Sequence, residues 1–285
     1  MASEPLPKGL IVDVLTPISQ EGGPDLPTYR LILKNLSTVC DMFLIGGPKV
    51  GLGDSLSLEE RVQLLQIALD STKRSDLLFF FISSKEISHV LQMVSTINGL
   101  PLDQGDRERI LLLDSPLLYH SNRGLLELYN GFSCHTSLPF VLLNDPELIR
   151  SLHISLKRSH IRTSILKDLI RIPAVKGIIS YGPFSRIKNY EKASRLRPEF
   201  RVYDGEEMRF LDYPNRSGVV SITSNLKPFL WKQVLDYSLG MRRFVGVETG
   251  GEYPLSLIRE IKSLSWLLGL KREKLQEICI ESIKG

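Results

Sequence analysis

Short runs of apolar residues recur along the chain, and amphipathic stretches with helical spacing lie between them. This alternation is typical of strand–helix units that build a parallel sheet. The runs consist almost entirely of Val, Ile, Leu and Phe, as expected for strands that are covered on both faces. The pattern predicts eight strands, at residues 10–15, 42–46, 77–82, 110–113, 140–143, 175–179, 200–203 and 218–222.

The stretches between the strands contain helix start signals. Ser57 and Glu60 have the spacing of a capping box, in which each side chain binds the free backbone N–H of the other residue. A second helix is expected to open at residues 84–86. The predicted inward faces are Val62, Leu65 and Leu69 in the first helix, and Ile87, Val90, Leu91 and Val94 in the second.

Eight strands alternating with helices over residues 1–226 fit a closed (β/α)8 TIM barrel better than an open sheet. From residue 227 onward the pattern predicts helices only, with apolar faces in residues 255–270 and 274–283. We therefore predict an α/β protein, a TIM barrel with a C-terminal helical extension (residues 227–285) packed on it.

Several segments, in this order and spacing, resemble the dihydrodipicolinate synthase / N-acetylneuraminate lyase family over nearly the whole chain. They are Gly9–Pro17, Leu56–Arg61, Leu138-Pro139 with Asn144-Asp145-Pro146, Val175–Ile178, Asp204–Glu207, and Gly218–Ser221 with Asn225, Lys227 and Pro228. The resemblance implies a class I aldol reaction with pyruvate, in which a lysine forms a Schiff base with the ketone. It also implies a proton-relay tyrosine, a Thr-Thr-Gly segment for the carboxylate and an arginine for the second substrate.

At the positions where the family has these functional residues, this chain has different ones. Ile179 stands where the family has its lysine, and Leu143 where it has its relay tyrosine. Lys49-Val50 replaces the two threonines, and Leu148 the arginine. A hydrocarbon side chain cannot form an imine, and Lys176 lies at an odd offset from Ile179, hence on the opposite face of a strand. No catalytic residue of the family is thus retained, and we expect apolar side chains to fill the former pocket.

Some polar residues remain near the predicted C-terminal mouth of the barrel, where this architecture places its active sites. Lys49 is expected there, and burial beside Val50 and Leu52 could lower its pKa and make it a nucleophile or an anion clamp. A lysine pointing into solvent is the alternative. The candidate substrate-binding residues are Lys49, Val50, Tyr119, Asn144, Ser180 and Ser221, and further polar residues expected at this mouth are Thr16, Ser83, Asp114 and Tyr181.

Composition excludes several other classes of function. The 36 basic and 32 acidic residues are mixed along the chain, so nucleic-acid binding has no support. Cys40, Cys134 and Cys279 lack metal-ligand spacing, which predicts no metal site. Gly46-Gly47-Pro48 lacks the context of a phosphate loop, and no cofactor is expected. The apolar runs are too short to span a membrane and the first residues contain no signal peptide, so a cytoplasmic protein is expected.

Two functions follow as hypotheses. The first is a non-catalytic member of the family that binds a small carboxylate or keto acid, or assembles with a partner. The second is an active lyase or aldolase that uses a relocated residue such as Lys49. Because residues 116–119 would form an exposed apolar patch on a single chain, a homodimer or homotetramer is expected.

Overall fold

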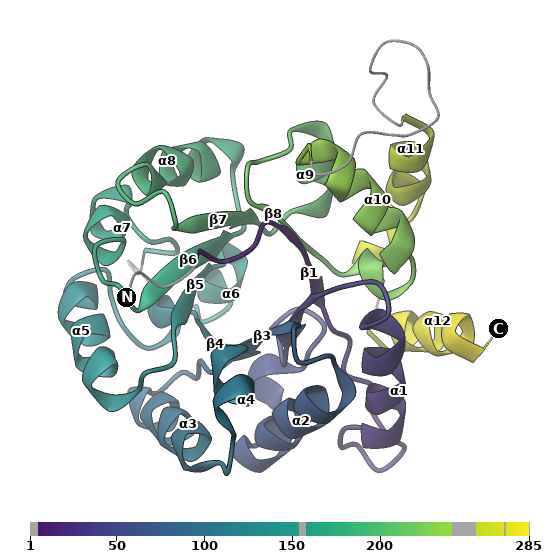
Figure 1. Ribbon diagram of the computed structural model, residues 1–285, viewed down its shortest axis with the longest axis horizontal. Helices are drawn as coiled ribbons and strands as arrows, with labels where there is room; N and C mark the ends of the chain where they lie inside the picture. Colours follow the sequence, from purple (N-terminus) through teal and green to yellow (C-terminus); the bar gives the residue numbers. More distant parts are fainter. Residues whose placement is uncertain (1–4, 154–157, 241–254, 271, 285) are drawn as a thin grey trace.

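The computed structural model describes residues 5–153, 158–240, 255–270 and 272–284. Eight parallel strands, β1 to β8, follow one another around a closed barrel, and helices surround it (Figure 1). The strands are β1 (Gly9–Asp13), β2 (Met42–Ile45), β3 (Leu77–Phe81), β4 (Ile110–Asp114), β5 (Phe140–Asn144), β6 (Val175–Ser180), β7 (Arg201–Asp204) and β8 (Gly218–Ser221). The predicted fold class is confirmed, and the predicted strand ends differ by one or two residues at most.

The helices lie on the outside of the barrel, and the last three, α10 to α12, follow the last strand. They are α1 (Leu26–Leu36), α2 (Leu58–Ser71), α3 (Ile87–Gly99), α4 (Gln104–Glu108), α5 (Leu125–His135), α6 (Pro146–Arg150), α7 (Thr163–Leu169), α8 (Phe184–Ser194), α9 (Glu207–Asp212), α10 (Pro228–Ser238), α11 (Leu255–Ser263) and α12 (Arg272–Lys284). Short 3₁₀ helices are η1 (Gly53–Ser55), η2 (Pro116–Leu118), η3 (Thr223–Asn225) and η4 (Ser265–Gly269).

The predicted capping box at the start of α2 is present. The Ser57 hydroxyl accepts from the backbone N–H of Glu60, and the Glu60 carboxylate accepts from the backbone N–H of Ser57. The prediction for α3 was partly wrong: Val90 and Val94 are buried, but Ile87 and Leu91 are exposed. They lie at the edge of the apolar stripe, whose centre is completed by Met93 and Ile97.

The interior face of the barrel follows from its strand register. The rings of Phe79 on β3 and Tyr203 on β7 meet edge to face, with centroids 6.1 Å apart, although these strands lie on opposite sides of the barrel (Figure 1). Both side chains therefore point inward. Residues paired in register on neighbouring strands share a face, which places Ile179 and Leu143 on the interior face as well.

The C-terminal helices lie beside one part of the ring. Helix α10 packs against β1, and α12 extends past α1 at the edge of the molecule (Figure 1). A second apolar cluster, separate from the main core, joins Leu267, Leu275 and Cys279 to Leu15 and Val50. The Gln276 side chain forms hydrogen bonds with both backbone groups of Ile18. The extension thus holds the loops that follow β1 and β2.

The expected apolar patch at residues 116–119 is not exposed. Pro116, Leu117 and Leu118 form η2 and are buried within the single chain, and Tyr119 is partly buried. The segment packs against β5 and α6, so the chain covers it without a partner. Within the described part of the chain, no helix is long and apolar enough to cross a membrane.

Candidate functional site

Lys49 and its partners form the candidate site, at the carboxyl ends of the strands. Lys49 follows β2, and its ammonium group lies 3.2 Å from the carboxylate of Asp145 and 3.1 Å from that of Glu147. Asp145 comes directly after β5 and is buried, whereas the Glu147 side chain, in the first turn of α6, is exposed. The lysine therefore links a loop after β2 to a loop after β5.

Tyr181 lies beneath this ion pair. The Lys49 ammonium group is 5.0 Å from the centre of the Tyr181 ring, a cation–π contact. Gly205, directly after β7, lies close against the same ring, because a Cβ there would come within 2.6 Å of the ring carbon Cγ. Burial raises the pKa of the Tyr181 phenol, and the nearby carboxylates of Asp13 and Asp145 raise it further. The phenol is therefore neutral and a poor proton acceptor.

The charge state of Lys49 differs from the sequence-based expectation. Burial alone would lower the pKa of the ammonium group, but the carboxylates of Asp145 and Glu147 outweigh burial, and the pKa is raised. The expected lowered pKa is thus wrong. The solvent-facing alternative is wrong too, since the side chain is only 28% exposed. Lys49 stays protonated, which suits an ion-pair role and not nucleophilic attack.

Two further carboxylates are buried at this end of the barrel. Glu207 accepts hydrogen bonds from the backbone N–H and the hydroxyl of Thr223, which fixes the turn after β8. Burial raises its pKa despite these bonds. Asp13, fully buried at the end of β1, shares the interior face with Leu44, its register partner, and lies against Gly47. Both carboxyl groups lie close enough to Tyr181 to raise the pKa of its phenol.

No protein-family model matches the chain. The 4-hydroxy-tetrahydrodipicolinate synthase of Herminiimonas arsenicoxydans is 21% identical over 239 residues, 82% of this chain and 76% of the relative. The synthase named the same way in Cytophaga hutchinsonii is 22% identical over 80% of this chain and 73% of its own length.

Solved structures agree in fold. The dihydrodipicolinate synthase of Bacteroides thetaiotaomicron has a TM-score of 0.74 at 15% identity, covering 93% of this chain and 83% of its own. YagE of E. coli, a prophage protein of the dihydrodipicolinic acid synthase family solved with pyruvate, has a TM-score of 0.72 at 14% identity, covering 97% and 87%. The chain resembles the dihydrodipicolinate synthases. The resemblance inferred from its motifs is thereby confirmed.

The two residues that the motifs align with the family's lysine and relay tyrosine lie together inside the barrel. Ile179 and Leu143 are paired in register on β6 and β5, and both are buried on the interior face. Lys176 lies on the other face of β6, near Arg197, and burial lowers its pKa. Among the residues of the eight strands it is the only lysine. The interior wall at β5 and β6 is therefore hydrocarbon.

Three of the candidate ligand-binding residues are occupied by structural hydrogen bonds. The Asn144 amide accepts from the Ile161 N–H and from the Tyr190 hydroxyl, on the helix side of the barrel. Ser180 pairs in register with Asn144 and so shares that outward face, and its hydroxyl donates to the carbonyl of Tyr181. Ser221 accepts from the backbone N–H of Ser224 and caps the turn after β8. The structure does not bring these residues together with Lys49.

The two other candidates also lie apart from Lys49's charged partners. Val50 directs its side chain into the second apolar cluster, with the C-terminal helices. The Tyr119 hydroxyl donates to the carboxylate of Asp114, which also accepts from Ser83 and Tyr129. This network anchors the end of β4 to α5, and burial raises the pKa of Asp114 despite its donors.

Sequence reasoning missed Asp145, Glu147 and Asp13 as members of the site. The one available signal was the Asn-Asp-Pro turn after the fifth strand, which places Asp145 at the mouth. Among the described residues, no group of three or more His, Cys, Asp or Glu side chains could hold a metal ion.

Proposed function

We propose that this chain is a divergent relative of the dihydrodipicolinate synthases that forms no Schiff base with pyruvate, and that it is a non-catalytic ligand-binding or assembly barrel. The observation that carries the proposal is the hydrocarbon wall of Ile179 and Leu143 on the interior face of β6 and β5. An imine requires an amine at the substrate, and without it the reaction has no electron sink.

The state of the two nearby lysines supports this proposal. Lys176 faces away from the interior, so it cannot reach a ligand in the barrel. Lys49 is at the correct end of the barrel but is held protonated by Asp145 and Glu147. A protonated amine has no lone pair to attack a ketone.

An active lyase or aldolase that uses Lys49 is the second candidate. Its support is the position of Lys49 at the mouth, partly buried and directly above Tyr181. For this enzyme to work, the ammonium group would have to leave Asp145 and transfer a proton. One experiment, chemical trapping of an imine, separates the two candidate functions.

The test is borohydride trapping with pyruvate, followed by intact-mass measurement. When an imine forms, the amine nitrogen bonds the ketone carbon with loss of water, and borohydride reduces the product to a stable amine. We expect no added mass on the wild type. Added mass that disappears in Lys49→Ala would establish the relocated-lysine enzyme and refute the non-catalytic barrel.

The variant Ile179→Lys tests the interior position. We expect the new lysine to be neutral because it is buried, and to be trapped by pyruvate without turnover, since Leu143 offers no proton relay. Ile179→Met, which keeps the volume, is the control for folding and should not be trapped. Trapping of neither variant would show that Ile179 does not occupy a substrate position. Assembly into a homodimer or homotetramer stays a prediction, for light scattering to measure.

A further inference from the structure

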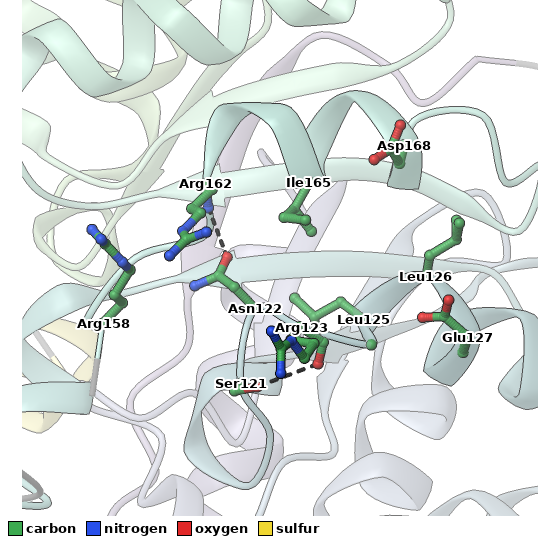
Figure 2. Close-up of a pocket in the computed structure, with 11 residues that line it drawn as sticks. Ser121, Asn122, Arg123, Leu125, Leu126, Glu127, Arg158, Arg162, Ile165 and Asp168 are labelled. Atoms are coloured by element: carbon green, nitrogen blue, oxygen red, sulfur yellow. Dashed lines mark hydrogen bonds between the residues drawn. The ribbon is translucent and has the colours of Figure 1, made fainter. Parts of the chain in front are cut away.

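A cavity of about 620 Å³ lies on the outer wall of the barrel, between α5 and α7 (Figure 2). Its walls come from the loop before α5, the first turn of α5, the segment before α7 and α7 itself. None of its lining residues belongs to the cluster around Lys49. Its volume is within the range of small-molecule sites, roughly 300–1,000 Å³.

Three arginines line one end of this cavity. Arg123 comes from the loop before α5, and Arg158 and Arg162 from the segment before α7 (Figure 2). Within the described part of the chain, none of the three has a carboxylate within 4.0 Å, although other arginines do. An anion would bring three guanidinium groups a partner that no carboxylate of the described chain supplies.

The arginine end is held in place by a buried side chain. Asn122 is only 8% exposed, and its amide accepts from the backbone N–H of Arg162 and donates to the carbonyl of His160. One side chain thus ties together the two loops that supply the arginines. The backbones of the two loops are therefore held together before a ligand binds, which lowers the entropy cost of binding, while the arginine side chains themselves are exposed.

The opposite end of the cavity is acidic. Glu127 and Asp168 lie there with Leu126 between them, and Leu125 and Ile165 occupy the space toward the arginines (Figure 2). Asp168 also has Arg171 at 3.8 Å, which neutralises part of its charge. Glu127 has no ion-pair partner among the described residues and is exposed. The lining therefore runs from cationic through apolar to anionic.

We propose that this cavity binds a small zwitterion, with its carboxylate or phosphate against the arginines and its ammonium group near Glu127. Guanidinium groups bind carboxylate and phosphate oxygens in a bidentate manner, and a short aliphatic spacer suits the apolar middle. The proposal goes beyond the function inferred from the barrel interior and does not depend on it.

The test is calorimetric titration of the full chain with matched probes. Zwitterionic probes are γ-aminobutyrate, ε-aminocaproate and phosphoethanolamine; caproate lacks the ammonium group and hexylamine lacks the carboxylate. We expect saturable binding of at least one zwitterion, and binding at least about tenfold weaker for the probes that lack one charge. The two head groups, carboxylate and phosphate, are distinguished by which zwitterion binds more tightly.

Two variants locate the site. Arg158→Ala with Arg162→Ala should weaken zwitterion binding about tenfold or more, and Glu127→Gln should remove the preference for ε-aminocaproate over caproate. Lys167→Ala removes an exposed cation of α7 that lies outside the cavity lining; it is the matched control and should bind normally. Absence of saturable binding, equal binding of caproate and ε-aminocaproate, or binding unchanged in the double arginine variant would each overturn the proposal. None of these outcomes changes the result expected from pyruvate trapping, so the two proposals can fail separately.

Discussion

The ion pair of Lys49 is the residue-scale feature with the clearest energetic consequence. Asp145 is buried, and one of its carboxylate oxygens already caps α6 through the N–H groups of Glu147 and Leu148. Replacing Lys49 by Met leaves the other oxygen without its cation. We expect Lys49→Met to lower the free energy of unfolding by about 2 kcal/mol, measured by urea denaturation at neutral pH.

The effect of Lys49 should also depend on pH. Because its pKa is raised in the folded protein, its stabilisation is complete at neutral pH and is lost as pH rises above about 10. The difference between wild type and Lys49→Met should therefore shrink in alkaline solution. Glu147→Gln is the control, because its carboxylate is 73% exposed and its loss should cost under about 1 kcal/mol. A difference that grows with pH would contradict this assignment.

Part of the candidate site could be predicted from the sequence. The position of Lys49 at the mouth follows from its place just after the second strand, and the alternation of strand faces separated Lys176 from Ile179. The partners of Lys49 could not be predicted, because Asp145 and Glu147 lie far away in the chain and come close only when the barrel closes. The sign of its pKa shift depends on those partners.

At the scale of elements, the loops after β6 and β7 meet through Tyr181 and Gly205. A methyl group at residue 205 would lie 2.6 Å from the Tyr181 ring, which is 7% exposed and has little room to move. Gly205→Ala should therefore destabilise the protein by about 1–3 kcal/mol through overpacking, measured by urea denaturation.

The same substitution in a helix gives a matched control. Gly131 lies inside α5, and a Cβ there would meet no atom within 4 Å. Gly131→Ala should leave stability unchanged or raise it by up to about 1 kcal/mol, since alanine favours a helix. If both variants behaved alike, the contact between Gly205 and Tyr181 would not limit this position.

The elements themselves were the most predictable part of the fold. Long apolar runs are covered on both faces in a parallel barrel, so their composition alone marked the eight strands. In amphipathic helices, burial is harder to predict for residues at the edges of the apolar stripe, as the exposed Ile87 and Leu91 show. The face of Val50 was not predictable, because its neighbours in the second cluster come from the far end of the chain.

For the whole molecule, the second apolar cluster is the main departure from a simple barrel. Leu15 and Val50, both in loops at the mouth, pack on Leu267 and Leu275 of the C-terminal extension instead of on the barrel core. Within the extension, α10 and α11 are anchored in the main core through Trp231 and Ile261, whereas η4 and α12 contribute to the second cluster. We therefore expect η4 and α12 to open without opening the strands. Such partial unfolding is visible as loss of amide protection in one contiguous unit.

Leu275→Ala tests this division. Leu275 is 4% exposed, and its truncation should cost about 2–4 kcal/mol within the second cluster. We expect faster amide hydrogen exchange in α12 and η4, with unchanged protection in the eight strands, measured by mass spectrometry. Leu65→Ala, a buried leucine of the main core on α2, is the control and should lower the protection of the strands. If Leu275→Ala lowered protection equally everywhere, the extension and the barrel would unfold as one cooperative unit.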